Sequence, residues 1–121
     1  MLRLMKERES INVVNDQVGA PTYATDLANA IMDIFSNNWH AGIYHYSNSG
    51  MISWYDFALE IKKISGSACE VNPIPSSQYP TPAKRPSFSL LNTDKIRQTF
   101  GIVIPDWRTS LEKCMKQLNS N

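Results

Sequence analysis

The feature that most constrains the fold is an alternation of short apolar runs with segments of helical periodicity. Apolar residues at 11–14, an alternating run at 42–50 and a short run at 69–75 each read as a strand. Between them, apolar residues recur at helical spacing over 24–35 and 54–64. This alternation predicts an α/β fold with few short strands and about five helices. Three strands leave much of a parallel sheet uncovered, so we expect the chain to be part of a larger α/β protein.

Capping residues place the ends of the expected helices. Thr22 or Thr25 can cap the helix over 24–35, Asp26 suits its positive N-terminal end, and residues 36–38 end it. Ser53 with Asp56 three residues later resembles a capping box. The apolar face of the helix that follows contains Trp54, Phe57, Ala58, Ile61 and Ile64, and Gly66 stops the helix.

The ends of the chain also read as helical. Residues 1–9 form a short helix or the tail of a longer one. A brief helix follows a cap at Asn92 or Thr93 and stops at Gly101, and Asp106 caps the last helix. That helix presents an apolar side made of Trp107, Leu111, Cys114 or Met115, and Leu118.

Composition excludes several classes of protein. The 121 residues are 42% apolar and 19% charged, which is typical of one globular domain. A formal charge of +1 gives no electrostatic case for a nucleic-acid partner. No run of about 18 apolar residues predicts a membrane span, and the N-terminus lacks the apolar region of a secretory signal.

The cysteines and tryptophans read as structural. Cys69 and Cys114 are isolated thiols, which indicates a reduced, cytoplasmic protein. Cys114 falls on the apolar stripe of the last helix, so we expect it in the core. Trp54 and Trp107 are also expected in the core, whereas Trp39 begins a loop and is expected to be partly exposed.

Motifs for cofactor and metal chemistry are missing from this sequence. The five glycines never reach G-x-G-x-x-G spacing, so no pyrophosphate-binding loop is encoded. No tyrosine has a lysine four residues later, and His40 and His45 fall on different elements, which disfavours a metal site. We therefore expect no catalytic, cofactor-binding or metal-ligating residues in this chain.

A polar loop at 15–22 is the first candidate site. It places Gln17, Gly19, Pro21 and Thr22, after Asp16, between a strand and a helix. In open α/β sheets, ligands bind beyond the carboxyl ends of strands. Gly19 can let a ligand approach the backbone, and Gln17 and Thr22 can hydrogen-bond it. The alternative is a tight turn in which Thr22 only caps the helix.

A proline-rich segment is the second candidate site. Five of the seven prolines lie in residues 73–86, which predicts an extended loop without ladder pairing. Such a long loop is commonly functional. Lys84 and Arg85 lie within it, and the planar donor fork of Arg85 suits a phosphate or carboxylate. The alternative is a solvated pair of surface charges.

Four blocks carry a family resemblance over nearly the whole chain. The blocks VVNDQVGAPTYATDLANAI, GIYHYSNSGMISWYDFALEI, RPSFSLLNTDKI and FGIVIPDWRTSLEKCM resemble the C-terminal part of dTDP-4-dehydrorhamnose reductases, in the extended short-chain dehydrogenase/reductase superfamily. Asp16, Gln17, Gly19, Pro21 and Thr22 match one family motif, and Arg85, Pro86, Ser89 and Leu91 match another. Thr25 stands where the family often has proline.

The resemblance implies a function and a domain organisation. The family reduces dTDP-4-dehydro-L-rhamnose to dTDP-L-rhamnose with NADPH or NADH, and some members use magnesium. Its fold is an N-terminal Rossmann domain followed by a smaller substrate domain. By this resemblance, residues 1–121 are the substrate-binding domain, and the glycine-rich loop and the Tyr-x-x-x-Lys lie upstream in a missing domain. The chain alone is then expected to be inactive, with Arg85 as a candidate contact to the diphosphate.

Other readings stay open. The chain can belong to another nucleotide-sugar reductase or epimerase, or to a non-catalytic regulatory homologue, and a Tyr-x-x-x-Lys upstream would distinguish them. A stand-alone interaction module that uses residues 73–86 is a third reading, but that segment lacks a P-x-x-P repeat with flanking basic residues. Without a covering sheet, Leu27, Ile31 and Ile34 are expected to be exposed, so that the chain self-associates or rearranges at this helix.

Overall fold

The structure is a computed structural model that describes residues 1–36 and 39–120. Within them the chain divides into two compact units. Unit 1 comprises residues 1–19 and 51–89, and unit 2 comprises residues 20–50 and 90–120. Each unit is therefore built from two separate stretches of sequence.

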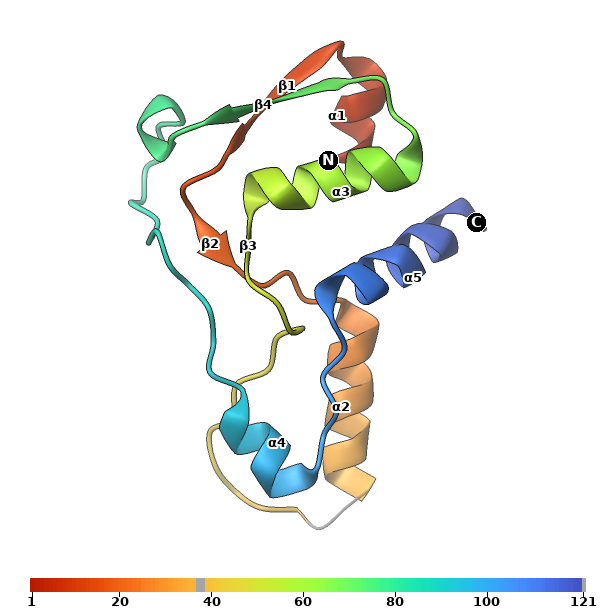
Figure 1. Ribbon diagram of the computed structural model, residues 1–121. Helices are drawn as coiled ribbons and strands as arrows, with labels where there is room; N and C mark the ends of the chain where they lie inside the picture. The colour runs from red at the N-terminus through yellow and green to blue at the C-terminus, as the bar shows by residue number, and fades with distance from the viewer. Residues whose placement is uncertain (37–38, 121) are drawn as a thin grey trace. The chain divides into compact units, whose positions relative to one another are not determined.

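Unit 1 is built around a parallel pair of strands, β1 (Ser10–Val14) and β4 (Glu70–Ile74). The register pairs Ser10 with Glu70 and Val14 with Ile74, so both strands end at the same edge. Helix α3 (Trp54–Ser65) contacts both strands, and α1 (Leu2–Glu7) contacts β1 and α3, as Figure 1 shows. This is a βαβ-like arrangement in which an apolar helical face covers an apolar strand pair.

The core of unit 1 follows the apolar pattern of the sequence. Its buried side chains are Met5, Ile11, Val13, Val14, Ile52, Ala58, Ile61, Cys69 and Val71. The capping box predicted at the start of α3 is confirmed: the Ser53 hydroxyl accepts from the Asp56 backbone N–H, and the Asp56 carboxyl accepts from the Ser53 N–H. Gly66 ends the helix in the left-handed conformation, also as predicted.

Two short strands were not predicted from the sequence. Within the loop expected at 15–22, β2 (Val18–Gly19) pairs antiparallel with β3 (Ile52–Ser53). The expectation that residues 73–86 form no ladder is wrong at its start, because Pro73 and Ile74 belong to β4. Pro73 lacks an N–H but its carbonyl remains an acceptor, so proline is tolerated in a two-stranded sheet. The 3₁₀ turn η1 (Ser76–Gln78) follows.

Unit 2 contains three helices: α2 (Ala24–Ser36), α4 (Asp94–Phe100) and α5 (Trp107–Asn119). The predicted strand at 42–50 is wrong. That segment runs as irregular chain, and its one ladder contact is a bridge between Ser49 and Asp106. Alternation alone cannot form a strand when no neighbouring strand is available to pair with it.

The predicted caps of unit 2 had mixed outcomes. Asp106 caps α5 by accepting from the Arg108 N–H, and Gly101 ends α4, both as predicted. Asn92 rather than Thr93 supplies the side-chain acceptor at α4, to the Asp94 N–H. At α2, neither Thr22 nor Thr25 occupies the N-cap position, because the helix begins directly after Tyr23. The expected end of α2 at Asn37 and Asn38 lies outside the described residues.

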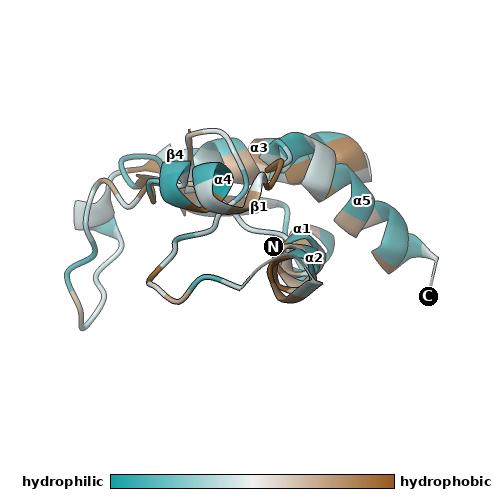
Figure 2. Ribbon diagram, turned by 90° about the horizontal axis from the view of Figure 1, so that it is seen from below, coloured by the Kyte–Doolittle hydropathy of each residue, from teal (hydrophilic) through white to brown (hydrophobic). Residues whose placement is uncertain are grey.

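Burial on the helices of unit 2 departs from simple stripes. On α5, Trp107, Leu111 and Met115 are buried as predicted, but Cys114 is only half-buried and Leu118 is exposed. Figure 2 shows apolar and polar residues alternating along this helix. On α2, Leu27 and Ile31 are exposed as predicted, whereas Ile34 is half-buried. Asp26 and Ala30 are the buried residues of α2, so a polar side chain faces the interior.

Candidate functional site

The carboxyl ends of β1 and β4 define the candidate site in unit 1. Residues 15–17 leave β1 and residues 75–85 leave β4 from the same edge, because the strands are parallel and in register. This edge is where open α/β sheets place ligands. The two loops that the sequence predicted as candidate sites therefore lie side by side at this edge. This holds for the parts of both loops that belong to unit 1.

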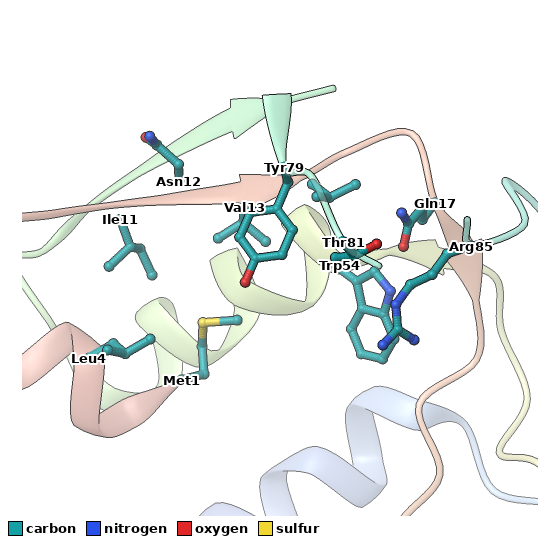
Figure 3. A pocket seen from close by; sticks show the side chains of 11 residues that line it. Met1, Leu4, Ile11, Asn12, Val13, Gln17, Trp54, Tyr79, Thr81 and Arg85 are labelled. Carbon is teal, nitrogen blue, oxygen red and sulfur yellow. The ribbon is translucent and has the colours of Figure 1, made fainter. Parts of the chain in front are cut away.

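A cavity of about 380 Å³ lies against these loops. Figure 3 shows its two ends: Met1, Leu4 and Ile11 lie at one end, and Gln17, Thr81, Trp54 and Arg85 gather at the other. Tyr79 lies between them. The cavity is thus mostly apolar, with Asn12 near Ile11 and the polar groups of Gln17, Thr81 and Arg85 at the other end, which is the usual composition of a small-molecule site.

Two aromatic rings border the cavity. Trp54 is the first residue of α3, and Tyr79 follows the 3₁₀ turn; their exposed fractions are 48% and 59%. The expectation that Trp54 lies in the core is wrong, because its side chain borders the open cavity and stays about half exposed. Exposed aromatic rings next to a guanidinium can stack with a heterocyclic base while the cation meets an anion.

Arg85 is the cation of this site. Its side chain lines the cavity, and within the described residues the guanidinium forms no hydrogen bond or ion pair with the protein. Lys84, its neighbour, is exposed and does not line the cavity. A guanidinium with five unused donors is well suited to a phosphate or carboxylate ligand.

A hydrogen-bonded cluster joins the two loops. The Asp16 carboxylate accepts from the Ser76 hydroxyl at 2.6 Å and from the Ser76 backbone N–H at 2.9 and 3.0 Å. Gln17 Nε2 donates to the Ser76 hydroxyl at 2.9 Å. The Ser76 hydroxyl and then its N–H lower the pKa of Asp16, because both favour the ionised carboxylate. Ser76 escaped the sequence analysis, although its position just after a parallel strand is a signal that could have found it.

Gly19 has a close neighbour in the structure. A Cβ placed on Gly19 would lie 2.8 Å from the Ser89 hydroxyl oxygen. Ser89 donates its N–H and its hydroxyl to the Val18 carbonyl, which holds residues 87–89 beside β2. The small size of Gly19 is therefore explained by this close packing.

The remaining two candidates belong to unit 2. Pro21 and Thr22 lie just before α2, and Thr22 is exposed. Of the five candidate residues, the structure brings Gln17 and Arg85 to one cavity, with Gly19 on the adjoining strand. Trp54, Tyr79 and Thr81 also line that cavity and were not among the sequence candidates.

A buried polar cluster follows Thr22 in unit 2. Asn48 donates to the Asp26 carboxyl at 2.7 Å, to the Ser110 hydroxyl at 3.0 Å and to the Pro105 carbonyl at 3.2 Å. Its own carbonyl accepts from the Tyr23 N–H at 2.7 Å. Burial, and then the charge of Asp26, raises the pKa of Tyr46 beside this cluster.

Metal-binding clusters and membrane-spanning helices are both absent from the described residues. These residues hold no cluster of three or more His, Cys, Asp or Glu side chains that could bind a metal ion, magnesium included. Among these same residues, no helix combines the length and the apolar character that crossing a membrane requires.

Parallel strands with a part-polar cavity at their carboxyl ends are the arrangement in which α/β domains commonly place a ligand. Comparison with known proteins identifies the family to which this chain belongs. Residues 1–120 match the family described as RmlD substrate binding domain, and the chain belongs to that family.

Two of the similar proteins are named as reductases. The chain is 43% identical to dTDP-4-dehydrorhamnose reductase of Escherichia coli K12 and 38% identical to that of Burkholderia thailandensis, covering 98% and 99% of this chain. These matches cover 43% and 46% of the two relatives, so the chain spans less than half of their length.

Solved structures agree on the fold. The crystal structure of a dTDP-4-dehydrorhamnose reductase from Clostridium acetobutylicum superimposes with a TM-score of 0.89 at 33% identity, over 98% of this chain and 42% of the other. The enzyme from Bacillus anthracis, solved in complex with NADP, also gives 0.89 at 34% identity, over 96% and 41%. The predicted resemblance and the fold class of a Rossmann-type reductase are confirmed.

Proposed function

We propose that this chain is the substrate-binding domain of a dTDP-4-dehydrorhamnose reductase. In the whole protein it would hold dTDP-4-dehydro-L-rhamnose, whose C4 ketone is reduced to give dTDP-L-rhamnose. The observation that carries the proposal is the cavity at the carboxyl ends of β1 and β4, which gathers Gln17, Trp54, Tyr79 and Arg85. The family and the named relatives supply the identity of the sugar nucleotide.

The proposed roles follow from the chemistry of each side chain. Arg85 would contact the diphosphate, because its guanidinium is unpaired within the described residues. Trp54 and Tyr79 would stack with the thymine ring or cover the sugar. Gln17 would hydrogen-bond the ligand. Gly19, Pro21 and Thr22 remain proposed as the substrate-side loop.

The cofactor would belong to another part of the protein. The spacing of the five glycines does not fit a dinucleotide pyrophosphate loop, so the residues of this chain do not fit NADPH or NADH. The complex of the B. anthracis enzyme with NADP supports nicotinamide chemistry in the whole protein. We therefore propose an N-terminal Rossmann domain as the missing partner, which carries the cofactor and the Tyr-x-x-x-Lys.

The cellular setting and the association state belong to the same proposal. Cys69 and Cys114 are free thiols, which supports a reducing compartment, and we propose the cytoplasm. The exposed apolar residues of α2 support self-association of the isolated chain.

A second candidate is another enzyme of nucleotide-sugar metabolism. The chain is 38% identical over 99% of its length to the spore coat polysaccharide biosynthesis protein SpsK of Bacillus subtilis, of which it covers 41%. That name leaves the sugar open. Comparing dTDP-4-dehydro-L-rhamnose with other nucleotide sugars as substrates of the full gene product would distinguish the two candidates.

Titration with nucleotides tests the proposal. We expect dTDP to shift the NMR signals of the Trp54 indole and of Arg85, and NADPH to leave them unchanged. Arg85→Ala should weaken dTDP binding about tenfold, as expected for the loss of a charge-assisted hydrogen bond. Lys84→Ala is the matched control, because this adjacent cation does not line the cavity. Equal effects of the two substitutions, or dTDP shifts confined to residues outside the cavity, would contradict the proposal.

A further inference from the structure

The cluster of Asp16, Gln17 and Ser76 determines more than the position of two loops. Asp16 and Gln17 follow β1, and Ser76 begins the 3₁₀ turn after β4. The contacts are short: 2.6 Å from the Ser76 hydroxyl to Asp16 and 2.9 Å from Gln17 Nε2 to the Ser76 hydroxyl. Gln17 also lines the cavity, so this cluster links a loop contact directly to the candidate site.

Counting protons fixes the orientation of the Gln17 amide. An ionised carboxylate can only accept hydrogen bonds, and a serine hydroxyl has one proton to donate. The Ser76 proton is used by Asp16, so the Ser76 oxygen can only accept from Gln17. Gln17 must therefore present its NH₂ group to Ser76, which leaves its carbonyl oxygen as the free end.

The free end faces the polar side of the cavity. Figure 3 shows the Gln17 oxygen on the side where the Arg85 guanidinium lies. Within the described part of the chain, no protein group donates to this oxygen. The cavity thus offers an acceptor close to a cation, and a ligand that satisfies both must carry a hydrogen-bond donor near an anionic group.

We propose that Asp16 and Ser76 are positioning residues that turn the Gln17 carbonyl oxygen toward the ligand, where it accepts a hydrogen bond from an N–H or O–H group. This inference rests on the proposed function and adds a specificity determinant to it. For a dTDP-sugar, the donor is either the imide N–H of thymine or a hydroxyl of the hexose. Without Ser76, the amide can rotate and present either end, so the preference for a donor is lost.

Variants of the full gene product separate positioning from general stability. Calorimetry would measure the affinity for dTDP and dTDP-L-rhamnose. We expect Gln17→Met and Ser76→Ala each to weaken binding about tenfold for the ligand that supplies the donor. Ser76→Thr keeps the hydroxyl and should stay within about twofold of wild type. Ser77→Ala, on the same turn and without a hydrogen bond among the described residues, should have no effect.

The double variant gives the decisive measurement. If Ser76 acts through Gln17, Gln17→Met combined with Ser76→Ala should bind no more weakly than Gln17→Met alone. Losses that multiply would show that Ser76 acts independently of Gln17 and would overturn the inference.

The source of the donor is identified with a third ligand, dTDP methylated at thymine N3. If the Ser76→Ala loss occurs for dTDP and disappears after methylation, the donor is the imide N–H. If the loss occurs only for dTDP-L-rhamnose, the donor is a hexose hydroxyl. If Ser76→Ala weakens the binding of all three ligands equally, the inference is overturned. It is also overturned if the wild-type protein binds normally and Ser76→Ala causes no loss of affinity. Neither result would contradict the proposed function. Failure of the wild-type protein to bind any of the three ligands would instead overturn the proposed function, and the inference with it.

Discussion

At the scale of single residues, the candidate site depends on contacts that a sequence motif cannot display. Gly19 was selected because glycine permits close approach to the backbone, and the structure shows Ser89 as the close neighbour. Its φ is not among the positive values, which occur at Gly50, Gly66 and Gly101. The requirement for glycine at position 19 is therefore one of space and not of backbone conformation.

The substitution Gly19→Ala tests this requirement. The added methyl group would lie 2.8 Å from the Ser89 oxygen, so either Ser89 or β2 must move. We expect a loss of about 1–2 kcal/mol in the free energy of unfolding, measured by urea denaturation. In a protein that already carries Ser89→Ala, the clashing oxygen is gone, so Gly19→Ala should lower the free energy of unfolding much less than it does in the wild type. Wild-type stability of Gly19→Ala would show that the packing at this position is looser than described.

At the scale of elements, the buried cluster of unit 2 connects helices that the apolar pattern alone does not join. Asn48 lies in irregular chain, yet it is fully buried and bonds to Asp26 of α2, Ser110 of α5 and the carbonyl before α5. The two N–H groups of the amide are shared among these three acceptors, and its carbonyl oxygen accepts from the Tyr23 N–H, which apolar side chains could not do. The segment predicted as a strand thus contributes a side-chain link between helices in place of a ladder.

Removing this amide should be costly. In Asn48→Ala, the Asp26 carboxyl loses a donor and the Tyr23 N–H loses its acceptor in a buried environment. We expect the free energy of unfolding to fall by about 2–3 kcal/mol. Asn29→Ala, at an exposed position of α2, is the matched control and should change it by less than about 0.5 kcal/mol. Urea unfolding of the two variants side by side measures both values, and equal stabilities would contradict the role of the cluster.

At the scale of the whole molecule, apolar side chains remain exposed on helix α2. In unit 2, α2 exposes Leu27, Ile31, Met32 and Phe35, with Met32 at 64% and Phe35 at 66%. Contiguous apolar surface of this kind is typical of regions that associate. The structure bears out the expected exposure of Leu27 and Ile31 but not that of Ile34, and self-association itself stays a prediction.

Sedimentation velocity over a range of concentrations would test this prediction. We expect the isolated chain to associate as its concentration rises, and Met32→Lys combined with Phe35→Lys to shift it toward monomer. Asn29→Lys places the same charge at an exposed polar position of α2 and serves as the control. A wild-type chain that stays monomeric at the highest concentration, with cooperative unfolding, would show that this surface does not drive association.

The sequence by itself determined the local features of this protein and its family. Helix ends at Gly66, Gly101 and Asp106, and the capping box at Ser53, were predictable because each depends on residues within one turn. The α/β class followed from periodicity, and the family followed from the spacing of motifs along the chain.

Only the tertiary structure decided which segments pair and which side chains meet. The pairing of β1 with β4 brings Asp16 to Ser76, 60 residues away, and places Gln17 and Arg85 at one cavity. The same folding leaves residues 42–50 without a strand partner, exposes Trp54 and buries Asp26. Strand pairing, burial and hydrogen bonding between distant residues depend on what the rest of the chain places opposite them. That information is spread over the whole sequence and cannot be obtained from any single segment.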